Sequence, residues 1–304
     1  MTEAYPVTIV ITTYHRPDRI SRAVDSALAQ TCDKEIIVVD DNGKDTDWHR
    51  QTAQQMTKYE GQVTYLVNEV NLGVSNARNR ALAIAEGKYI TFLDDDDEIA
   101  PTKLEKQIQR MEELGEDYSC CYCAYIKYLS RGRIHHSHET LEGDVFLPTI
   151  ARVFYPGSGS NLLVRTQYLK DVGGYDPELT RFEDYEIMVK LLKDRKLAYV
   201  DEELLTIHYE IREKNPTYES LIVDDEKYFA KVRLYLETLN RNDRDTVMKI
   251  AALERWRYAL PRHEMKDAVR NMKSVGVSAG LFIRYLFYLT DRVVRKRSYG
   301  FKPF

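Results

Sequence analysis

The sequence has few cysteines, no long apolar run and little net charge, and each shortage excludes a class of protein. Its 304 residues include four cysteines, with Cys120, Cys121 and Cys123 close together, which excludes the disulfide framework of a small secreted domain. No run of about 18 apolar residues occurs, so no segment is predicted to span a membrane. A net charge of −4 excludes a global polycation, so we expect no nucleic-acid partner.

The start of the chain also lacks the marks of secretion. Met1–Pro6 carries neither a basic leader nor a long apolar core, so we expect no cleaved signal. With so few cysteines, the sequence predicts a cytoplasmic protein whose thiols are reduced. The length allows one α/β domain of roughly 200 to 250 residues plus an appendage.

Two glycine-rich motifs that bind nucleotide phosphates are missing as well. No Gly-x-Gly-x-x-Gly follows a predicted strand, and Gly-x-x-x-x-Gly-Lys-Ser/Thr occurs nowhere. A nucleotide bound here would therefore need another partner for its pyrophosphate, such as a metal ion held by acidic residues.

The most informative feature that is present is a run of four acids, Asp94, Asp95, Asp96 and Asp97, directly after the apolar segment Tyr89–Leu93. Adjacent ionised carboxylates repel one another unless a positive charge shares their site. Mg²⁺ and Mn²⁺ prefer oxygen ligands, and Mg²⁺ is often shared between one or two carboxylates and substrate phosphates. The run therefore predicts a divalent-cation site. The alternative is a solvated acidic loop before the helix that starts near Pro101.

Strand and helix patterns alternate over the first hundred residues. The predicted strands cover 7–11, 35–39, 63–67 and 88–93, and helical spacing of apolar residues follows over 17–30, 48–56, 75–86 and 101–114. This alternation predicts an α/β fold with a mostly parallel central sheet and flanking helices. Right-handed crossovers bring the carboxyl ends of the strands to one edge, where ligands of open α/β sheets bind.

The strand ends carry residues suited to a nucleotide. Thr12 and Tyr14 follow the first strand, Asp41 the second and the acid run the fourth. An aromatic ring can stack on a base, and a carboxylate can accept from a base N–H or a ribose hydroxyl. Arg78 or Arg80, on the preceding helix, can reach the phosphates, and the sequence does not choose between them.

Six stretches, in one order and spacing across roughly residues 5 to 210, resemble the family 2 inverting glycosyltransferases with the GT-A fold. They are VTIVITTYHR (7–16), EIIVVDDNG (35–43), NLGVSNARNRA (71–81), GKYITFLDDDDEIAP (87–101), GSNLLVR (159–165) and VGGYDPELTRFEDYE (172–186). The resemblance is closest to bacterial enzymes that build surface polysaccharides. It implies a GT-A, Rossmann-like catalytic domain over 1–212, with a sugar-nucleotide half at about 1–100 and an acceptor half at about 101–212.

The resemblance also assigns donor-binding roles. In the family, the positions of Thr12 and Tyr14 cradle or stack on the base, Asp41 bonds the base, and Arg16 ends the first motif. Asp94-x-Asp96 matches the Asp-x-Asp motif. Its first acids, Asp94 and Asp95, contact ribose or phosphate, and Asp96 coordinates the divalent metal, Mn²⁺ or Mg²⁺. Arg78 lies where a basic residue can reach the phosphates.

The later motifs imply the catalytic and acceptor-side residues. Glu183 and Asp184 resemble an acidic pair whose aspartate is the catalytic base, with Glu183 in support; the alternative for Asp184 is a helix-start residue. His208 lies where some relatives add a metal ligand, although a histidine that ends a strand is often only a satisfied polar residue. The loop of Ser158, Gly159, Ser160 and Asn161 is predicted to admit the acceptor or the donor sugar.

The last part of the chain, 213–304, matches no family that we can name and reads as a helical extension. Its predicted helices are 218–239, 244–260, 263–273 and 279–297. In the last one, an apolar face lies beside an excess of basic residues, which favours an anionic membrane surface. The alternative is a helix packed on the domain or on a second subunit of a homodimer. The face consists of Leu281, Phe282, Tyr285, Leu286, Leu289 and Val293.

Together these features predict an inverting, metal-dependent glycosyltransferase of the hexosyltransferase type. The donor would be a nucleoside-diphosphate sugar, by family habit UDP-linked, and the acceptor a hydroxyl of a saccharide or lipid-linked molecule in surface-polysaccharide synthesis. We expect a peripheral protein at the inner face of the cell membrane. Two alternatives remain: a non-catalytic sugar-nucleotide-binding or scaffold protein, and a sugar nucleotidyltransferase. The nucleotidyltransferase should show a glycine-rich basic loop after the first strand, where this chain has TTYHRP.

Overall fold

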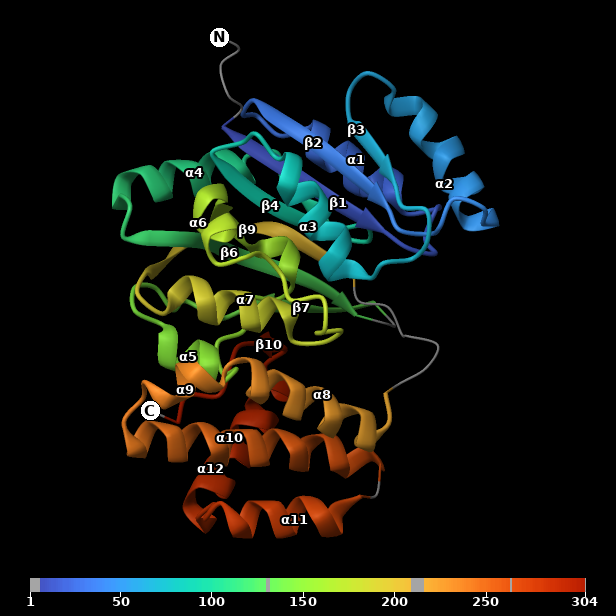
Figure 1. The fold of residues 1–304 in the computed structure, drawn as a ribbon. Helices are drawn as coiled ribbons and strands as arrows, with labels where there is room; N and C mark the ends of the chain where they lie inside the picture. The colour runs from blue at the N-terminus through green and yellow to red at the C-terminus, as the bar shows by residue number, and fades with distance from the viewer. Residues whose placement is uncertain (1–5, 130–131, 209–215, 263, 304) are drawn as a thin grey trace.

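The computed structural model describes residues 6–129, 132–208, 216–262 and 264–303, and its centre is a mixed sheet covered by helices (Figure 1). The first half of the sheet is parallel, in the order β4-β1-β2-β3. Its strands are β1 (Val7–Thr13), β2 (Lys34–Asp40), β3 (Thr64–Val67) and β4 (Tyr89–Asp94). The main helices between and after them are α1 (Ile20–Leu28), α2 (Asp47–Met56), α3 (Val74–Ile84) and α4 (Lys103–Leu114).

In the second half, the sheet changes direction. β8 runs antiparallel to both β4 and β6, and β9 runs parallel to β6 on the other side of that long strand. The strands are β5 (Glu98–Ile99), β6 (Tyr118–Leu129), β7 (Arg133–Ser137), β8 (Leu163–Arg165) and β9 (Lys196–His208). The helices are α5 (Phe146–Ile150), α6 (Thr166–Asp171) and α7 (Glu183–Leu192). The predicted α/β class with flanking helices is confirmed, and the sheet is mixed beyond its first four parallel strands.

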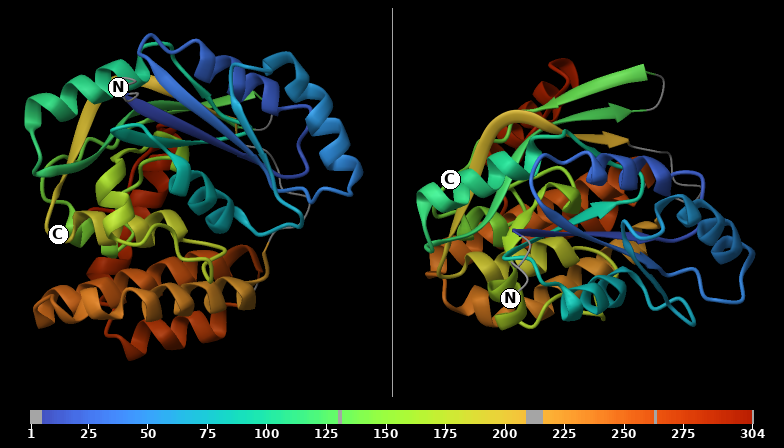
Figure 2. Two further views of the ribbon diagram at one scale, coloured as in Figure 1. Left: turned by 45° about the horizontal axis from the view of Figure 1, so that its top comes forward. Right: turned by 90° about the horizontal axis from the view of Figure 1, so that it is seen from above.

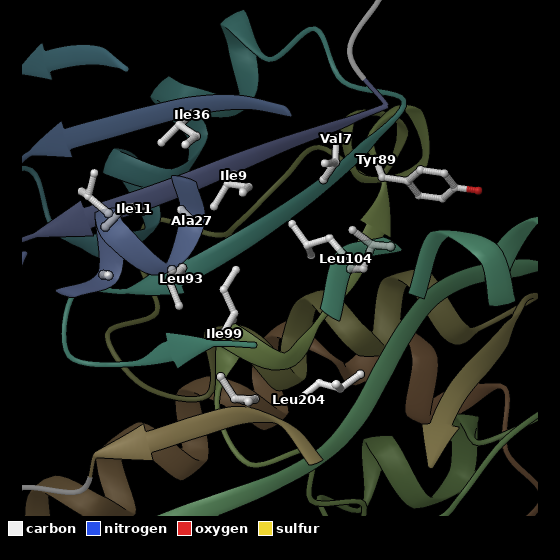
Figure 3. Packing of buried hydrophobic residues seen from close by; sticks show 14 of the residues in the cluster. Val7, Ile9, Ile11, Ala27, Ile36, Tyr89, Leu93, Ile99, Leu104 and Leu204 are labelled. Atoms are coloured by element: carbon white, nitrogen blue, oxygen red, sulfur yellow. The ribbon is translucent and has the colours of Figure 1, made fainter. Parts of the chain in front are cut away.

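The apolar core lies on both sides of the sheet because side chains alternate along each strand. On one side, Ile9 and Ile11 of β1 pack with Leu93 and Leu104 (Figure 3). On the other side, Val10 packs with Ile37 and Phe92 and with residues of α3 and α7. The four parallel strands are therefore fixed from both faces, and their polar ends are held at one edge.

The helical extension is part of the same folded unit. It consists of α8 (Tyr218–Lys231), α9 (Arg233–Glu237), α10 (Arg241–Ala259), α11 (Met265–Ser274), α12 (Ala279–Val294) and the short strand β10 (Arg297–Ser298). These helices form a layer below the sheet (Figure 2). Phe146 and Ile150 of α5 and Val189 of α7 share an apolar cluster with Ile250 and Tyr285 of the extension. The predicted division at residues 212 and 213 falls outside the described residues, as does the start at Met1.

The end of the chain differs from its prediction. The last helix ends at Val294 rather than at Arg297, since the backbone turns at Lys296, with φ of 54°, and then pairs with β7 as β10. Tyr125 donates a hydrogen bond of 2.7 Å to Ser298, which fixes this strand to the sheet. Removing the segment from Leu281 onward would therefore expose part of the core.

The predicted membrane face of α12 packs largely against the domain. The ring of Phe282 meets Trp256 edge-on at 4.9 Å, and the buried Tyr285 donates to Glu254 at 2.5 Å. Leu281 and Leu289 pack on the same cluster. Packing on the domain, the alternative expectation, therefore describes most of this face, whereas Leu286 and Val293 are exposed. Among the helices that the structure describes, none combines the length and apolar character needed to cross a membrane.

Candidate active site

The four acids that leave β4 alternate between the interior and the open edge of the sheet. Asp95 and Asp97 are buried, whereas the side chains of Asp94 and Asp96 are 33% and 16% exposed. The backbone N–H of Asp97 donates to the carbonyl of Asp94 at 3.0 Å, which closes a turn. Because alternate acids point outward, the two members of the predicted Asp-x-Asp motif face the same edge.

The two buried acids attach neighbouring loops to this turn. Asp95 accepts from the Thr13 hydroxyl at 2.7 Å and from Arg16 at 2.9 Å. Asp97 accepts from the hydroxyls of Ser158 and Ser160 at 3.0 and 2.7 Å. Burial raises the pKa of Asp95 to about 6 against the opposing effects of Thr13 and Arg16. Burial, followed by the charge of Asp94, raises the pKa of Asp97 to about 7.

Arg16 supplies positive charge to the outward-facing side of the acid run. Its Nη1 contacts Asp95 at 2.9 Å and Asp96 Oδ2 at 2.8 Å. Arg22 donates to the backbone carbonyl of Asp96 at 2.6 Å. Thr13 and Arg22 were not predicted as site residues. The signal for Thr13 was its place, one residue before Tyr14, at the end of a strand whose neighbour carries the acids.

The residues present fit a hard divalent cation that is shared with a ligand. Asp94 and Asp96 offer carboxylate oxygens at the open edge, the donor type that Mg²⁺ and Mn²⁺ take. Among the described residues, no group of three or more His, Cys, Asp or Glu side chains converges to hold a metal by itself. Such an ion would therefore need further oxygens from phosphate or water, which is the usual setting of Mg²⁺.

His208 lies beside the acid run, and its ring is engaged by other groups. Its backbone N–H donates to Asp97 at 3.3 Å, its Nε2 lies 2.7 Å from Glu98 Oε1, and its ring stacks on Tyr128 at 5.5 Å. The contact with Glu98 uses Nε2, so Nδ1 is the ring nitrogen that can bind an ion, and a carboxylate on the other nitrogen is usual for a metal-bound histidine. The role of His208 as a ligand stays a prediction.

Arg78 joins the acid run to the acidic pair of α7. Its buried guanidinium donates to Asp184 at 2.8 Å and contacts Asp94 at 3.3 Å. The same group lies over the rings of Phe92 and Tyr175, with distances of 5.6 and 5.0 Å to the ring centres. The buried Nε of Arg78 has no hydrogen-bond partner.

Arg80 and Arg78 point to different places. The guanidinium of Arg80 donates to the carbonyl of Val67 at 2.7 Å and to Asn68, away from the acid run. Arg78 is therefore the one of the two that reaches both Asp94 and Asp184.

The pair Glu183 and Asp184 opens α7, where the helix dipole favours negative charge. Phe182 precedes the pair in a left-handed conformation, with φ of 65°. Burial raises the pKa of Asp184, and Arg78 opposes that effect. Burial and then the charge of Asp184 raise the pKa of Glu183 to about 7. Both carboxylates are partly exposed and lie in an environment that favours taking up a proton.

The predicted loop at 158–161 lies against the carboxylate of Asp184. A Cβ at Gly159 would lie 3.0 Å from both carboxylate oxygens of Asp184 and 3.1 Å from Arg78 Nη2, so glycine permits this close approach. The Ser160 hydroxyl also accepts the backbone N–H of Asp94 at 3.0 Å. The Asn161 side chain is enclosed and bonds the backbone of Cys123 and Pro156. Its part in ligand binding stays a prediction.

At the β2 end of the same sheet edge, Asp41 organises a loop. It accepts from the backbone N–H groups of Leu72 and Gly73 at 2.8 and 2.9 Å, and from the side chains of Asn68 and Asn71. These four bonds fix the segment between β3 and α3. Asp41 therefore positions this loop, and its predicted bond to a base stays a prediction.

Three aromatic side chains form an exposed stack beside this loop. Tyr14 stacks on His15 with ring centres 3.7 Å apart, and His15 on Trp48 at 4.9 Å. Thr12 lies nearby, opposite Asp94 in the register of β1 and β4. His15 and Trp48 were not predicted. The available signal was an isolated tryptophan in the polar segment that follows Asp41.

Comparison with solved structures supports the fold. The S. aureus TarS structure of residues 1–349 in complex with UDP-GlcNAc superimposes with a TM-score of 0.67 and 19% identity, over 95% of this chain and 87% of that one. The mannosyltransferase PcManGT from Pyrobaculum calidifontis, in complex with GDP-Man and Mn²⁺, gives 0.57 and 13%, over 96% and 81%. At these identities the likeness shows the architecture.

Sequence comparison identifies the family. The chain is 30% identical over 208 residues to an uncharacterized glycosyltransferase of Rickettsia prowazekii, which covers 66% of this chain and 62% of that protein. It is 27% identical over 189 residues to the putative colanic acid biosynthesis glycosyl transferase WcaA of Escherichia coli, covering 61% and 66%. The chain thus spans less than two thirds of the Rickettsia relative. Residues 8–173 match the family described as glycosyl transferase family 2, and the chain belongs to that family.

Proposed function

We propose that the protein is an inverting, metal-dependent glycosyltransferase that moves a sugar from a nucleoside-diphosphate sugar to an acceptor hydroxyl. The observation that carries the proposal is the position of Arg78, whose guanidinium contacts both Asp94 and Asp184. The group proposed to hold the diphosphate and the group proposed to remove the proton therefore contact the same side chain.

The donor would lie along the strand-end edge. Tyr14, with Thr12 and Asp41 near it, would hold the base, while Asp94, Arg16 and Arg78 would hold ribose and phosphates. Relatives by fold support this donor class, since TarS structures contain UDP or UDP-GlcNAc and the PcManGT structure contains GDP-Man. We propose UDP as the nucleotide.

Asp96 would hold the divalent ion together with the diphosphate, with His208 as a further candidate ligand. The ion, Mn²⁺ or Mg²⁺, would supply Lewis-acid neutralisation of the charge that grows on the leaving diphosphate. The PcManGT complex with Mn²⁺ supports the use of such an ion in this fold. Two side chains of the protein add positive charge beside the acids: Arg16 contacts Asp96, and Arg78 contacts Asp94.

Asp184 would act as the catalytic base. An acceptor hydroxyl is a poor nucleophile near neutral pH, so a positioned carboxylate must take its proton as it attacks. Burial raises the pKa of Asp184, which strengthens it as a base, and Arg78 keeps its ionised form available. A single carboxylate on the acceptor side fits single displacement with inversion, whereas a glycosidase needs two carboxylates that flank the bond.

We further propose that the acceptor is a saccharide or lipid-linked molecule and that the reaction belongs to surface-polysaccharide synthesis at the inner face of the cell membrane. The likeness to WcaA, a putative colanic acid enzyme, supports this role. A lipid-linked acceptor would lie in a membrane, and the basic C-terminal segment would then bind the protein to that membrane.

The test is incubation of the purified protein with a panel of sugar nucleotides and Mn²⁺, with release of nucleoside diphosphate as the readout. We expect release with a UDP-sugar and none in excess EDTA or with Asp96→Ala. Asp194→Asn, which changes an exposed carboxylate just beyond α7, is the matched control and should keep full activity. Full turnover in excess EDTA would contradict the proposed dependence on a divalent metal ion. Binding without turnover of any sugar nucleotide or acceptor would indicate a binding protein. Release of pyrophosphate from a nucleoside triphosphate and a sugar phosphate would indicate a nucleotidyltransferase.

A further inference from the structure

α12 also carries apolar side chains that the described part of the domain leaves exposed. These side chains lie along one stripe of the helix beside the face that packs on α10: one group comes before Thr290 and the other follows it. Their exposed fractions are 50% for Ile283, 37% for Leu286, 71% for Phe287, 74% for Val293 and 73% for Val294. We call this set the apolar stripe. Contiguous exposed apolar side chains of this size mark an interaction surface, whereas scattered ones do not.

A basic hollow adjoins the carboxyl-terminal end of the stripe. It has a volume of about 520 Å³ and is lined by the basic residues Arg133, Arg295, Lys296 and Arg297 together with Gly132, Ile134 and His136. None of the described residues that line it carries a carboxylate. The acids nearby already have partners, since Asp291 contacts Arg295 at 2.8 Å and Glu203 contacts His136 at 2.6 Å.

The stripe and the hollow form one continuous surface. Val293 and Val294 end the helix, and Arg295 follows at its C-cap. The chain then turns at Lys296, and Arg297 enters β10 opposite His136 of β7. β10 therefore fixes the basic residues beside the strand that lines the rest of the hollow.

We propose that this surface binds an anionic lipid bilayer, with the apolar stripe at the level of the acyl chains and headgroup phosphates in the basic hollow. Apolar burial and attraction between basic side chains and anionic lipids act together in such contacts. A second copy of the chain fits less well, because the described residues that line the hollow and form the stripe include no carboxylate to pair with the basic side chains. Only the purpose of this surface rests on the proposed function: it would give the enzyme access to a lipid-linked acceptor.

The orientation of the surface agrees with that purpose. β6 and β7 form a hairpin, with Arg133 of β7 opposite Leu129 of β6. One residue earlier on β6, Tyr128 pairs with His208, whose backbone contacts Asp97 of the acid run. The basic hollow therefore lies at the tip of the hairpin that leads to the candidate active site.

The test is co-sedimentation of the full chain with vesicles of phosphatidylcholine alone or mixed with phosphatidylglycerol. We expect binding to the mixed vesicles only, weakened at high salt because surface charges are screened. Phe287→Glu should lower the partition coefficient by about tenfold or more, and Lys296→Glu by about fivefold. Leu234→Glu, at a similarly exposed residue on α9, and Arg270→Glu on α11 are the matched controls and should bind as the unchanged protein does.

Each outcome has a defined meaning. Equal binding to both vesicle types, or to neither, would overturn the proposal. A dimer in gel filtration that Phe287→Glu converts to monomer, without vesicle binding, would assign the stripe to a second copy instead. Thermal unfolding and UDP binding of each variant show that it is folded. Vesicle binding by a protein that releases no nucleoside diphosphate would overturn the proposed function and leave this surface assignment standing.

Discussion

Nη1 of Arg78 lies 2.8 Å from Oδ1 of Asp184, so the proposed base is held by a cation that also contacts Asp94. A diphosphate bound beside Asp94 would meet the same guanidinium. Donor binding and the charge state of the proposed base would therefore be linked through one buried side chain. The rings of Phe92 and Tyr175, which meet each other edge-to-face at 5.1 Å, both pack against that side chain.

Asp184→Asn should separate chemistry from donor binding. The amide keeps the shape of the side chain and can still accept from Arg78, but it cannot take a proton. We expect the transfer rate to fall by about 10² to 10⁴, the usual range for loss of a general base, with donor affinity within a few-fold. The measurements are single-turnover transfer and UDP-sugar titration. Glu183→Gln is the companion variant, and a larger loss there than in Asp184→Asn would move the base to Glu183.

Gly159→Ala should displace the proposed base. The added Cβ would lie 3.0 Å from both oxygens of Asp184, which is tighter than an ordinary contact, so the carboxylate must shift. We expect a fall in kcat of about tenfold or more, because small misplacements of a reacting group are costly. Gly280→Ala is the control, since a Cβ there meets no neighbouring atom within 4 Å. An unchanged kcat in Gly159→Ala would mean that Asp184 is not held against this loop during the reaction.

The parallel half of the sheet was predictable because β-branched runs and helical spacing repeat there in sequence. The direction in which each acid of the run points was not predictable, because four identical residues carry no periodic signal. Only the turn at Asp97 shows that Asp94 and Asp96 point outward. The contact of Gly159 with Asp184 joins two separate motifs, and the residue pattern of neither motif predicts it. The position of α12 was left open for a related reason: it has more apolar side chains than the core covers, and the pattern alone does not say which of them the core takes.

Asp97 should make stability depend on pH. Its pKa is raised from 3.8 to about 7 in the folded protein, so the native state holds a proton that the unfolded state has released between these values. The stabilisation from this group is fully present below about pH 4 and is lost as the pH rises through about 7. Asp97→Asn removes the titration. We therefore expect the free energy of unfolding of the unchanged protein, minus that of Asp97→Asn, to decrease from pH 5 to pH 7 in urea titrations. A constant difference would show that Asp97 ionises normally.

Asp225→Ala should test whether the helical extension supports the proposed base. Asp225 of α8 is buried and pairs with two arginines, Arg255 at 2.5 Å and Arg152. The Arg152 guanidinium lies 4.3 Å from the ring centre of Phe182, the left-handed residue directly before the acidic pair. Removing the shared carboxylate leaves two guanidinium groups near each other without their anion.

We expect Asp225→Ala to lower the free energy of unfolding by about 3 to 5 kcal/mol, the range for breaking a buried ion pair. If the network also positions α7, kcat should fall at temperatures where the variant is fully folded, while donor affinity changes little. Asp224→Ala, the preceding acid on the same helix, is the control for both measurements. A destabilised variant with normal kcat would show that the network only holds the helices on the domain. Phe182 would then keep the acidic pair in place even when Arg152 has lost its partner.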